Sequence, residues 1–387
     1  MSNGALGAEA KMLRPSFVEV DLQAIGRNVR TLKKAAAKNK GCLLMAVVKA
    51  NAYGHGAIPV SEWALRQGAD WLGVALPQEA LELRDAGISA PILVMGYSDP
   101  ASYKPLVDAG VRMAVYTRSQ GEAIAAVARE TGREASIHLK VDTGMGRIGF
   151  WPDDQALRDI IALAAMEGLE LEGCFTHFAR ADEDDEASWR AQFRIFLDFL
   201  GELQKSGIVF PIAHCANTAA GMRDEAALLN MYRTGIGVYG LYPSEEAKAW
   251  GLISLEPALS WKSILSHVKW LPQGCGVGYG HIWVAQKDTL VGTVPLGYAD
   301  GFSKALNNKG RVLVRGKKLP VIGRVCMDQF MVDLTAAPDA CPGDEVVLIG
   351  RQGDEEISAD ELAALAGTNC YEIVNTISGR VPRRYLA

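Results

Sequence analysis

The first residue that suggests chemistry is a lysine, Lys49, at the end of an apolar run. The stretch from Leu43 to Gly56, LLMAVVKANAYGHG, has the pattern of a buried strand that ends on an ammonium group. Loss of solvation at such a place lowers the pKa of a lysine from about 10.4 and makes its neutral, nucleophilic form accessible. A solvated cap at the end of a strand is the ordinary alternative, because most lysines are exposed.

Polar side chains also stand beside several other strand-like runs. Arg147 lies in KVDTGMGRIG, and His177 closes CFTHFA. Asn217 and Thr218 close AHCANTAA, and Arg233 opens the strand that leads into TGIGVYG. Each of these residues alone has an ordinary structural explanation. Their coincidence at strand ends indicates one site, since the loops that follow parallel barrel strands converge on a single face.

These residue types match the needs of pyridoxal phosphate chemistry. That cofactor requires a lysine to bind it covalently, amides and hydroxyls for its phosphate, and a partner for its pyridine nitrogen. Lys49 supplies the first of these. The loop RTGIGVYG offers glycine-flanked amides at Gly235 and Ile236, and Thr218 adds a hydroxyl. Arg233, two residues before this loop, is then placed to reach the ring.

The elements that must position these residues alternate between strands and helices from about residue 17 to residue 242. Short apolar runs alternate with amphipathic segments that end at a glycine or a basic turn. The strand candidates are FVEVDL, CLLMAVVKA, WLGVAL, PILVMGY, VRMAVYT, SIHLKVDT, LEGCFTHFA, PIAHCAN and TGIGVYG. About eight such units in about 230 residues predict an α/β fold, a (β/α)8 TIM-like barrel.

A mainly β C-terminal domain is expected after the barrel. Beyond residue 251 the chain has strand-like pieces such as TLVGTVPLG and DEVVLIG, separated by glycine, proline and Asn-Asn turns, with one helix candidate, SADELAALAG. We therefore expect a cofactor-binding barrel over 12–250 and a β-rich domain over 251–387. The first strand candidate, FVEVDL, is one more than the barrel needs and is a candidate member of the β domain.

Composition and charge argue against several other classes of protein. The net charge is -5, the pI is near 5.8, and no basic cluster occurs, so a nucleic-acid partner is not expected. No signal peptide or run of about 18 apolar residues is found, which predicts a cytoplasmic chain without a membrane partner. The seven cysteines form no Cys-x-x-Cys pair and the six histidines no His-Glu-x-x-His motif, so no metal site is expected.

A series of motifs between Arg14 and Arg383 closely resembles the alanine racemase family. The lysine motif AVVKANAYGHG is followed in order by LKVDTGMGRIGF, THFA, HCANTAA, YRTGIGVYGLYP, VGYG, PLGYADG, GRVCMDQFMVDL and ISGRVPR. The resemblance implies pyridoxal phosphate-dependent racemisation of L-alanine and D-alanine by two bases, which supplies D-alanine as a peptidoglycan precursor for cell-wall synthesis. It also implies a barrel followed by a β domain, and a head-to-tail homodimer with shared active sites.

The same resemblance implies roles for individual residues. Lys49 would carry the cofactor and act as the base for the D-enantiomer. Tyr279, contributed by the partner subunit, would act as the base for the L-enantiomer. Arg147, the backbone of Met327, and Asp328 would lie at the substrate.

Further positions would serve the cofactor. Arg233 would face the pyridine nitrogen, and His177 would link Arg233 to the catalytic tyrosine. The residues implied at the phosphate and beside it are Tyr53, Asn217, Thr218, Gly235 and Ile236. Lys140 matches a family lysine that is often carbamylated, and as an anion it would orient the substrate-binding arginine.

One position departs from the family pattern. Gly379, in TISGRVPR, stands where the family commonly has a tyrosine that narrows the substrate pocket. A glycine leaves space and adds backbone freedom. We predict weaker exclusion of larger substrates such as serine, so a broader-specificity amino-acid or serine racemase is the alternative within this fold.

Three further alternatives, of which the first belongs to the same cofactor class, are weaker. A barrel-type amino-acid decarboxylase would show its own glycine-rich phosphate loop and a cysteine motif, and neither is recognisable here. A nicotinamide oxidoreductase is suggested by GMGRIG at 144–149, but in a dinucleotide fold the glycines open a helix at once, and here FWPDD intervenes. Non-catalytic cofactor-binding relatives keep the lysine but lack a β domain and its Tyr279.

Overall fold

Two compact units make up the chain. The computed structural model describes residues 14–387. One unit comprises Leu22–Pro257, and the other joins residues 14–21 to Ala258–Ala387. The sequence-based ranges were 12–250 and 251–387, and residues 12 and 13 lie outside the described part.

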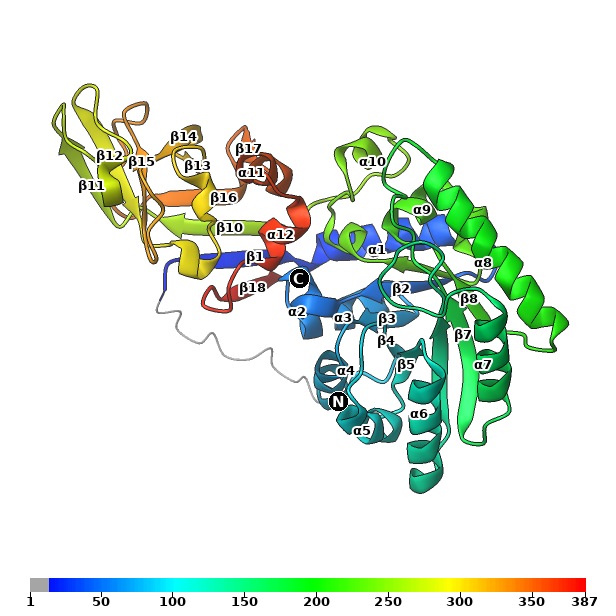
Figure 1. The fold of residues 1–387 in the computed structure, drawn as a ribbon. Coiled ribbons are helices and arrows are strands. Elements are labelled where there is room, and N and C mark those ends of the chain that lie inside the picture. Colours follow the sequence, from blue (N-terminus) through cyan, green and yellow to red (C-terminus); the bar gives the residue numbers. More distant parts are fainter. Residues whose placement is uncertain (1–13) are drawn as a thin grey trace. The chain divides into compact units, whose positions relative to one another are not determined.

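The first unit is a nearly closed barrel of eight parallel strands, which confirms the predicted fold class (Figure 1). The strands are β2 (Leu43–Val47), β3 (Trp71–Val74), β4 (Ile92–Val94), β5 (Arg112–Val115), β6 (Ala135–Lys140), β7 (Leu169–Phe175), β8 (Ile212–His214) and β9 (Met231–Thr234). They follow the order β8-β7-β6-β5-β4-β3-β2-β9. Two backbone hydrogen bonds, from Asn230 N to Ala213 O (3.0 Å) and from Arg233 N to Ala216 O (3.2 Å), link the ends of this sheet.

Helices connect the barrel strands, and the longer ones lie around the sheet (Figure 1). They are α1 (Leu22–Ala36), α2 (Lys49–Tyr53), α3 (Ala57–Arg66), α4 (Pro77–Asp85), α5 (Tyr103–Asp108), α6 (Arg118–Thr131), α7 (Asp154–Ala164), α8 (Ala187–Lys205), α9 (Thr218–Arg223) and α10 (Glu245–Ala249), with short 3-10 turns η1 (Pro100–Ser102), η2 (Ala226–Leu228) and η3 (Ile236–Tyr239). Side-chain caps explain where two of these helices begin. Thr117 accepts a hydrogen bond from Gln120 N at α6, and Asp153 accepts one from Ala156 N at α7.

The second unit is built on a ten-stranded sheet. Its strands are β1 (Phe17–Asp21), β10 (Leu259–Ile264), β11 (His267–Leu271), β12 (Thr289–Val294), β13 (Arg311–Val314), β14 (Lys317–Ile322), β15 (Phe330–Asp333), β16 (Glu345–Gln352), β17 (Glu355–Ile357) and β18 (Arg383–Leu386). The order is β11-β12-β15-β14-β13-β16-β10-β1-β18, with β17 on β16. The first strand, β1, therefore pairs with β10 and β18 rather than with the barrel.

Short helices complete this unit: η4 (Tyr279–His281), η5 (Tyr298–Asp300), η6 (Lys304–Leu306), α11 (Ala359–Ala366) and α12 (Cys370–Asn375). The predicted helix SADELAALAG corresponds to α11, whose N-cap Ser358 accepts a hydrogen bond from Glu361 N. Helix α12 was not predicted. Its start is marked by another side-chain cap, because Asn369 accepts a hydrogen bond from Glu372 N.

Two predicted strand boundaries are wrong at the site. Strand β2 ends at Val47, and Lys49 begins the short helix α2 instead of ending the strand. Of the predicted strand over 234–240, only Thr234 lies in a strand, and Ile236–Tyr239 form the 3-10 turn η3. Strand β9 begins earlier, so Arg233 is its third residue rather than its first. The buried residues on either side of Arg233, Tyr232 and Thr234, pair with β2. Gly235 and Gly237 follow, and glycines weaken a strand, so the pairing ends there.

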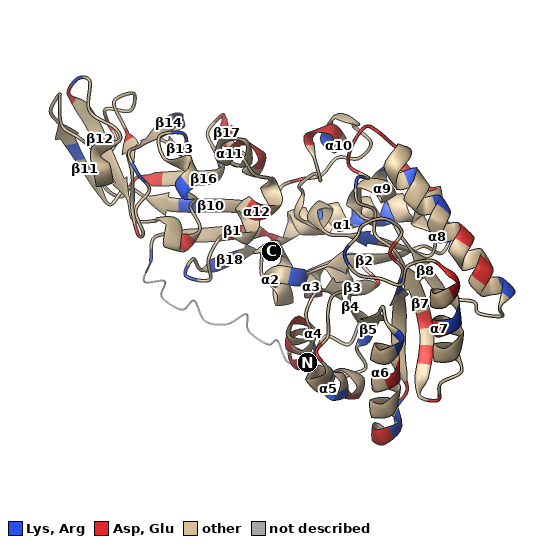
Figure 2. Cartoon of the chain, in the orientation of Figure 1, with Lys and Arg blue, Asp and Glu red and all other residues tan. Residues whose placement is uncertain are grey.

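Charged side chains of both signs are interspersed along the outer helix α8 (Figure 2). On this helix, Arg190 pairs with Glu186 at 2.5 Å and Lys205 with Glu202 at 2.7 Å. Mixed charge of this kind is typical of a solvated helix face, whereas a surface that binds nucleic acid is predominantly basic. No helix in residues 14–387 has the length and apolar character of a membrane span.

Candidate active site

A left-handed turn follows the first barrel strand. Four consecutive residues without glycine, Ala50 to Tyr53, have φ values of 51°, 53°, 54° and 51°. This conformation costs roughly 1 to 2 kcal/mol per residue for L-amino acids, so the surrounding structure must hold it. The turn brings Lys49 back towards Tyr53, and the lysine Nζ lies 5.9 Å from the centroid of the tyrosine ring.

Glu79 holds the beginning of this turn. Its carboxylate accepts hydrogen bonds from Ala50 N (2.5 Å), Ala75 N (2.8 Å) and Leu76 N (3.1 Å), so it joins the turn to the start of α4. Our sequence reasoning missed Glu79. The signal was present as a carboxylate at the third position of a helix that begins with proline, Pro77, which is a capping pattern.

The surroundings of Lys49 lower its pKa. The side chain is half-buried. Burial and the neighbouring Arg147 guanidinium lower the pKa of Lys49, while the Glu79 carboxylate acts in the opposite direction. The predicted nucleophilic amine therefore has a physical basis in the structure.

Lys49 lines a cavity of about 360 Å³ in the barrel unit. The lining residues are Lys49, Ala75, Met95, Gly96, Tyr97, Lys140, Arg147, Ile148, Phe175, His177 and Arg233. Four of them are lysines or arginines, of which the two arginines keep their positive charge, and no carboxylate is found among these lining residues. A cavity with this charge favours an anionic ligand.

Arg233 is a buried cation held by several acceptors. Its Nη1 donates to His214 Nδ1 (3.0 Å), and its Nη2 donates to Thr176 O (2.8 Å) and Cys215 O (3.2 Å). Burial lowers the pKa of Arg233 to about 10, so the group remains protonated at neutral pH. The guanidinium thus presents a fixed positive charge to the cavity that it lines.

His177 lines the same cavity beside Arg233. Arg233 Nη2 lies 3.3 Å from His177 Nδ1. Burial, followed by the charges of Arg233 and Arg147, lowers the pKa of His177 well below its ordinary value. A neutral His177 that accepts at Nδ1 carries its proton on Nε2 and can donate it to a further group.

The residues expected at the phosphate form a close cluster in the barrel unit. Gly235 N donates to Thr218 Oγ1 at 3.1 Å. A Cβ atom at Gly235 would lie 2.5 Å from the Tyr53 hydroxyl oxygen, so only glycine leaves this approach open. Ile236 follows at the start of η3. Asn217 caps α9 instead, since its side-chain oxygen accepts from Ala220 N at 3.0 Å.

The loop after β6 is shaped by Asp142. Its carboxylate accepts hydrogen bonds from Gly144 N, Gly146 N and Arg147 N, each 3.0 Å long. This fixes the backbone that carries the Arg147 side chain. Lys140, at the end of the same strand, donates to Val141 O at 2.7 Å. Burial and the charge of Arg233 lower the pKa of Lys140 to about 8, despite the opposing effect of Asp142.

This arrangement fits pyridoxal phosphate, the cofactor expected from the sequence. The barrel unit offers an amine with a lowered pKa at Lys49, a cationic cavity for an anion, and an arginine that lines it. It also has the glycine cradle at Gly235, which a side chain would close. These features match the aldehyde, phosphate and ring of the cofactor.

The remaining predicted residues lie in the other unit, around a cavity of about 670 Å³. Tyr279, Met327 and Asp328 all line it. Tyr279 is 71% exposed and stands between Gly278 and Gly280, whose φ values are 68° and 69°. The structure therefore brings the predicted residues together in two groups, one in each unit.

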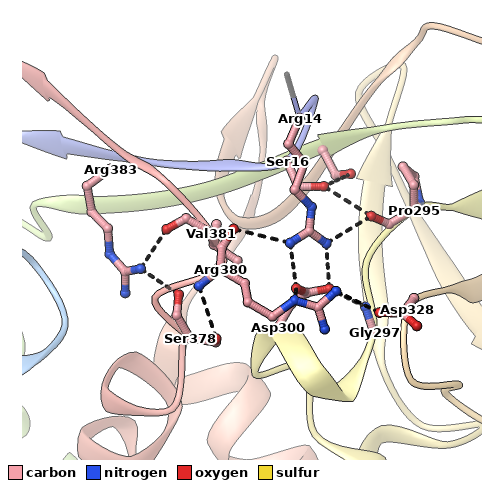
Figure 3. Close-up of polar contacts among 11 residues, drawn as sticks. Arg14, Ser16, Pro295, Gly297, Asp300, Asp328, Ser378, Arg380, Val381 and Arg383 are labelled. Atoms are coloured by element: carbon pink, nitrogen blue, oxygen red, sulfur yellow. Dashed lines mark hydrogen bonds and ion pairs between the residues drawn. The ribbon is translucent and has the colours of Figure 1, made fainter. Parts of the chain in front are cut away.

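A buried carboxylate organises the backbone near Asp328 (Figure 3). Asp300 accepts two hydrogen bonds of 2.6 Å from Arg14 and a third, 3.0 Å long, from Gly297 N. Arg380 lies 3.5 Å from Asp300 and donates to Asp328 at 2.7 Å. Gly379 precedes Arg380, and a Cβ atom added there would meet nothing within 4 Å.

Family models and relatives match nearly the whole chain. The model for "Alanine racemase, N-terminal domain" matches residues 20–243, and that for "Alanine racemase, C-terminal domain" matches residues 258–385. An alanine racemase of Desulforamulus reducens is 44% identical over 97% of this chain and 100% of its own length. That of Symbiobacterium thermophilum is 47% identical over 96% and 97%, respectively.

A solved structure is similar to this chain in both fold and sequence. Alanine racemase from Bacillus anthracis, described with bound L-Ala-P, has a TM-score of 0.92 and 40% identity, and the alignment covers 98% of this chain and 96% of that one. Both domains of the family are therefore present over the full described length. The chain belongs to the alanine racemase family.

Proposed function

We propose that this chain interconverts L-alanine and D-alanine with pyridoxal phosphate as its cofactor. The observation that carries the proposal is Lys49, an amine with a lowered pKa beside a cationic cavity, in a chain that matches alanine racemases throughout. The product D-alanine would serve cell-wall synthesis in the cytoplasm. A homodimer with shared active sites would be the working form.

Residues of the barrel would hold the cofactor. When bound, pyridoxal phosphate supplies an electron sink that makes the α-proton of an attached amino acid removable. Lys49 would bind it covalently, and Arg233 would face the ring nitrogen. Because Arg233 keeps its proton, it favours an unprotonated ring nitrogen. The phosphate would lie at Tyr53, Thr218, Gly235 and Ile236, with the Asn217 cap fixing the start of α9 nearby.

Racemisation needs a base on each face of the substrate's α-carbon. Lys49 would take or return the proton on the D-face, and the partner's Tyr279 would do so on the L-face. A tyrosine has an ordinary pKa near 10, so it needs help to act as a base. His177 can provide this help, because its Nδ1 faces Arg233, which leaves the proton on Nε2 to be donated to the tyrosine oxygen.

The substrate carboxylate requires cationic and amide donors. Arg147 lines the barrel cavity, and the Asp142 loop fixes its backbone. Among the described residues, no hydrogen bond uses the backbone N–H of Met327, so this amide is available to a ligand. Asp328 would stand beside it, held by Arg380. Carbamylation of Lys140 would add an anion to the cavity and offset the repulsion among its cations.

Proton exchange in deuterated solvent tests the proposed reaction. With L-alanine, we expect loss of the α-proton, appearance of both enantiomers and no carbon dioxide, measured by proton NMR and chiral chromatography. A decarboxylase would release carbon dioxide, and a non-catalytic cofactor-binding protein would leave the α-proton in place. A purified protein without a visible absorption band of the cofactor would contradict the proposal.

A methyl group at Gly235 is expected to weaken cofactor binding. In Gly235→Ala the new Cβ would lie 2.5 Å from the Tyr53 hydroxyl, so the tyrosine or the loop must shift. We expect the Kd for pyridoxal phosphate to rise about 10- to 100-fold, measured by absorbance titration of the cofactor-free protein. Gly201→Ala on α8 is the matched control, because its Cβ meets nothing within 4 Å. Equal affinities of the two variants would count against the cradle.

The absence of a tyrosine at position 379 is expected to broaden substrate use. A Cβ atom at position 379 meets nothing within 4 Å and the φ of Gly379 is not positive, so we expect Gly379→Tyr to fold. We expect this variant to lower kcat/KM for serine about tenfold relative to that for alanine, since one additional atom on a substrate is discriminated by about 1 to 3 kcal/mol in a fitted pocket. A racemisation panel in which serine is no better tolerated by the natural chain would reject this prediction.

A further inference from the structure

A row of buried polar side chains continues from Arg233 away from the cavity. It passes through His214 and His138 to Glu172 and ends at Arg112. The proposed function assigns a role to Arg233 alone among these residues. Both imidazoles have no exposed surface, while the side chains of Glu172 and Arg112 are 13% and 24% exposed.

Each neighbouring pair in this row is within hydrogen-bonding distance. Arg233 Nη1 lies 3.0 Å from His214 Nδ1, His214 Nε2 lies 2.8 Å from His138 Nδ1, and His138 Nε2 lies 3.2 Å from Glu172 Oε2. The rings are also fixed by packing. His214 stacks on Phe175 with ring centroids 4.9 Å apart. Gly173 leaves room for His138, since a Cβ atom there would lie 2.4 Å from His138 Nδ1.

The direction of these hydrogen bonds follows from the chemistry of the end groups. A guanidinium only donates, so His214 must accept at Nδ1 and carry its proton on Nε2. His214 then donates to His138 Nδ1, which leaves the His138 proton on Nε2, where it is donated to the carboxylate. Both histidines are neutral in this arrangement. Burial is the main reason that the pKa of each is lowered.

The far end of the row requires a group that only accepts. Glu172 receives hydrogen bonds from Arg112 Nε (2.9 Å), Arg112 Nη2 (3.0 Å) and His138 Nε2 (3.2 Å). Burial opposes ionisation of this carboxyl, but the hydrogen bonds from His138 and Arg112 outweigh it and lower its pKa to about 2. A carboxylate accepts on both oxygens, and no neutral side chain of that size does so.

We propose that His214, His138 and Glu172 are positioning residues that form a one-directional hydrogen-bond chain, which fixes the orientation of the Arg233 guanidinium at the cofactor ring. The part that concerns the ring rests on the proposed function. The direction of the chain does not, because it depends only on contacts within the barrel unit. Buried, fully satisfied networks of this kind are rigid, since every member has one arrangement that pairs all donors with acceptors.

Removing the charge of Glu172 without changing its shape should disturb Arg233 through the two histidines. In Glu172→Gln the side-chain amide must point at a donor of Arg112 or at His138 Nε2. If the amide nitrogen points at His138, Nε2 of that imidazole must accept, so its proton moves to Nδ1. His214 must then accept at Nε2 and carry its proton on Nδ1, where the N–H faces the Arg233 guanidinium. Either placement leaves two donors in contact, which costs the network a hydrogen bond.

Nitrogen NMR of the holoenzyme labelled with ¹⁵N-histidine tests the direction of the chain. We expect His138 and His214, assigned through His138→Gln and His214→Gln, to remain neutral Nε2–H tautomers over the neutral pH range. An Nδ1–H tautomer or an imidazolium at either position would overturn the proposal. The tautomers are read from the natural chain and the variants serve only for assignment, so the result does not depend on whether a Glu172 variant folds or on whether the protein racemises alanine.

Glu172→Gln then tests the effect at the cofactor. We expect changed nitrogen shifts of His138 or His214, a shifted visible absorption band of the bound cofactor, and a roughly tenfold lower kcat with a smaller change in KM. Glu170→Gln is the matched control, because Glu170 lies on the same strand, exposed, and contacts Ser136 at 2.5 Å. A Glu172→Gln protein with unchanged shifts and an unchanged absorption band would refute the chain.

Discussion

Replacing Lys49 with alanine is expected to lower kcat for both directions of alanine racemisation by at least about 10⁴-fold, because one change removes the cofactor attachment and a general base. The fold should persist, since Lys49 is only half-buried and burial lowers its pKa, so its ammonium group is not a source of stability. Racemisation rates from each enantiomer, with circular dichroism to verify folding, measure the effect.

Lys205→Ala is the control for this substitution. Lys205 lies exposed at the end of α8 and contacts Glu202 at 2.7 Å, so its removal should leave the rate unchanged. Borohydride reduction of the natural protein should fix the cofactor to Lys49, detected by peptide mass spectrometry, and Lys49→Ala should give no such adduct. If Lys49→Ala racemised alanine at a rate within tenfold of the natural protein, Lys49 would be neither the cofactor attachment nor a catalytic base.

Replacing Tyr279 with phenylalanine is expected to affect the two enantiomers unequally. Proton abstraction from L-alanine should fall by about 10² to 10⁴-fold, the usual contribution of a positioned general base. Lys49 remains, so D-alanine should still exchange its α-proton with deuterated solvent while racemisation is lost. Proton NMR of each enantiomer separates these outcomes. Tyr385→Phe, a partly exposed tyrosine of the same unit, is the control.

Mixing the two inactive variants tests whether the sites are shared between subunits. Hybrid dimers of Lys49→Ala and Tyr279→Phe would contain one intact site, and random exchange would restore up to about a quarter of the natural activity. No recovery after verified subunit exchange would contradict a site completed by the partner's Tyr279. Equal loss of exchange for both enantiomers in Tyr279→Phe would contradict the assignment of two separate bases.

Much of the fold could be predicted from local pattern. The alternation of apolar runs with amphipathic segments indicated the barrel, because strands and helices impose different periods on the sequence. The strand FVEVDL could be excluded from the barrel by counting the strand candidates, because it is one more than the eight that a barrel needs. Helix α12 and the position of β9 were harder, since a cap and the pairing with β2 decide them, and neither shows as periodicity.

The sequence by itself determined the kind of site: a lysine after an apolar strand, glycine-flanked amides and an arginine next to them, in an order that resembles one family. Only the tertiary structure decided how these groups are held. The left-handed turn at Ala50–Tyr53 requires Glu79 from another βα unit, and Arg233 faces His214 because strands β8 and β9 meet there. Such contacts join residues far apart in the chain, and they depend on strand register and burial, which a local pattern cannot specify.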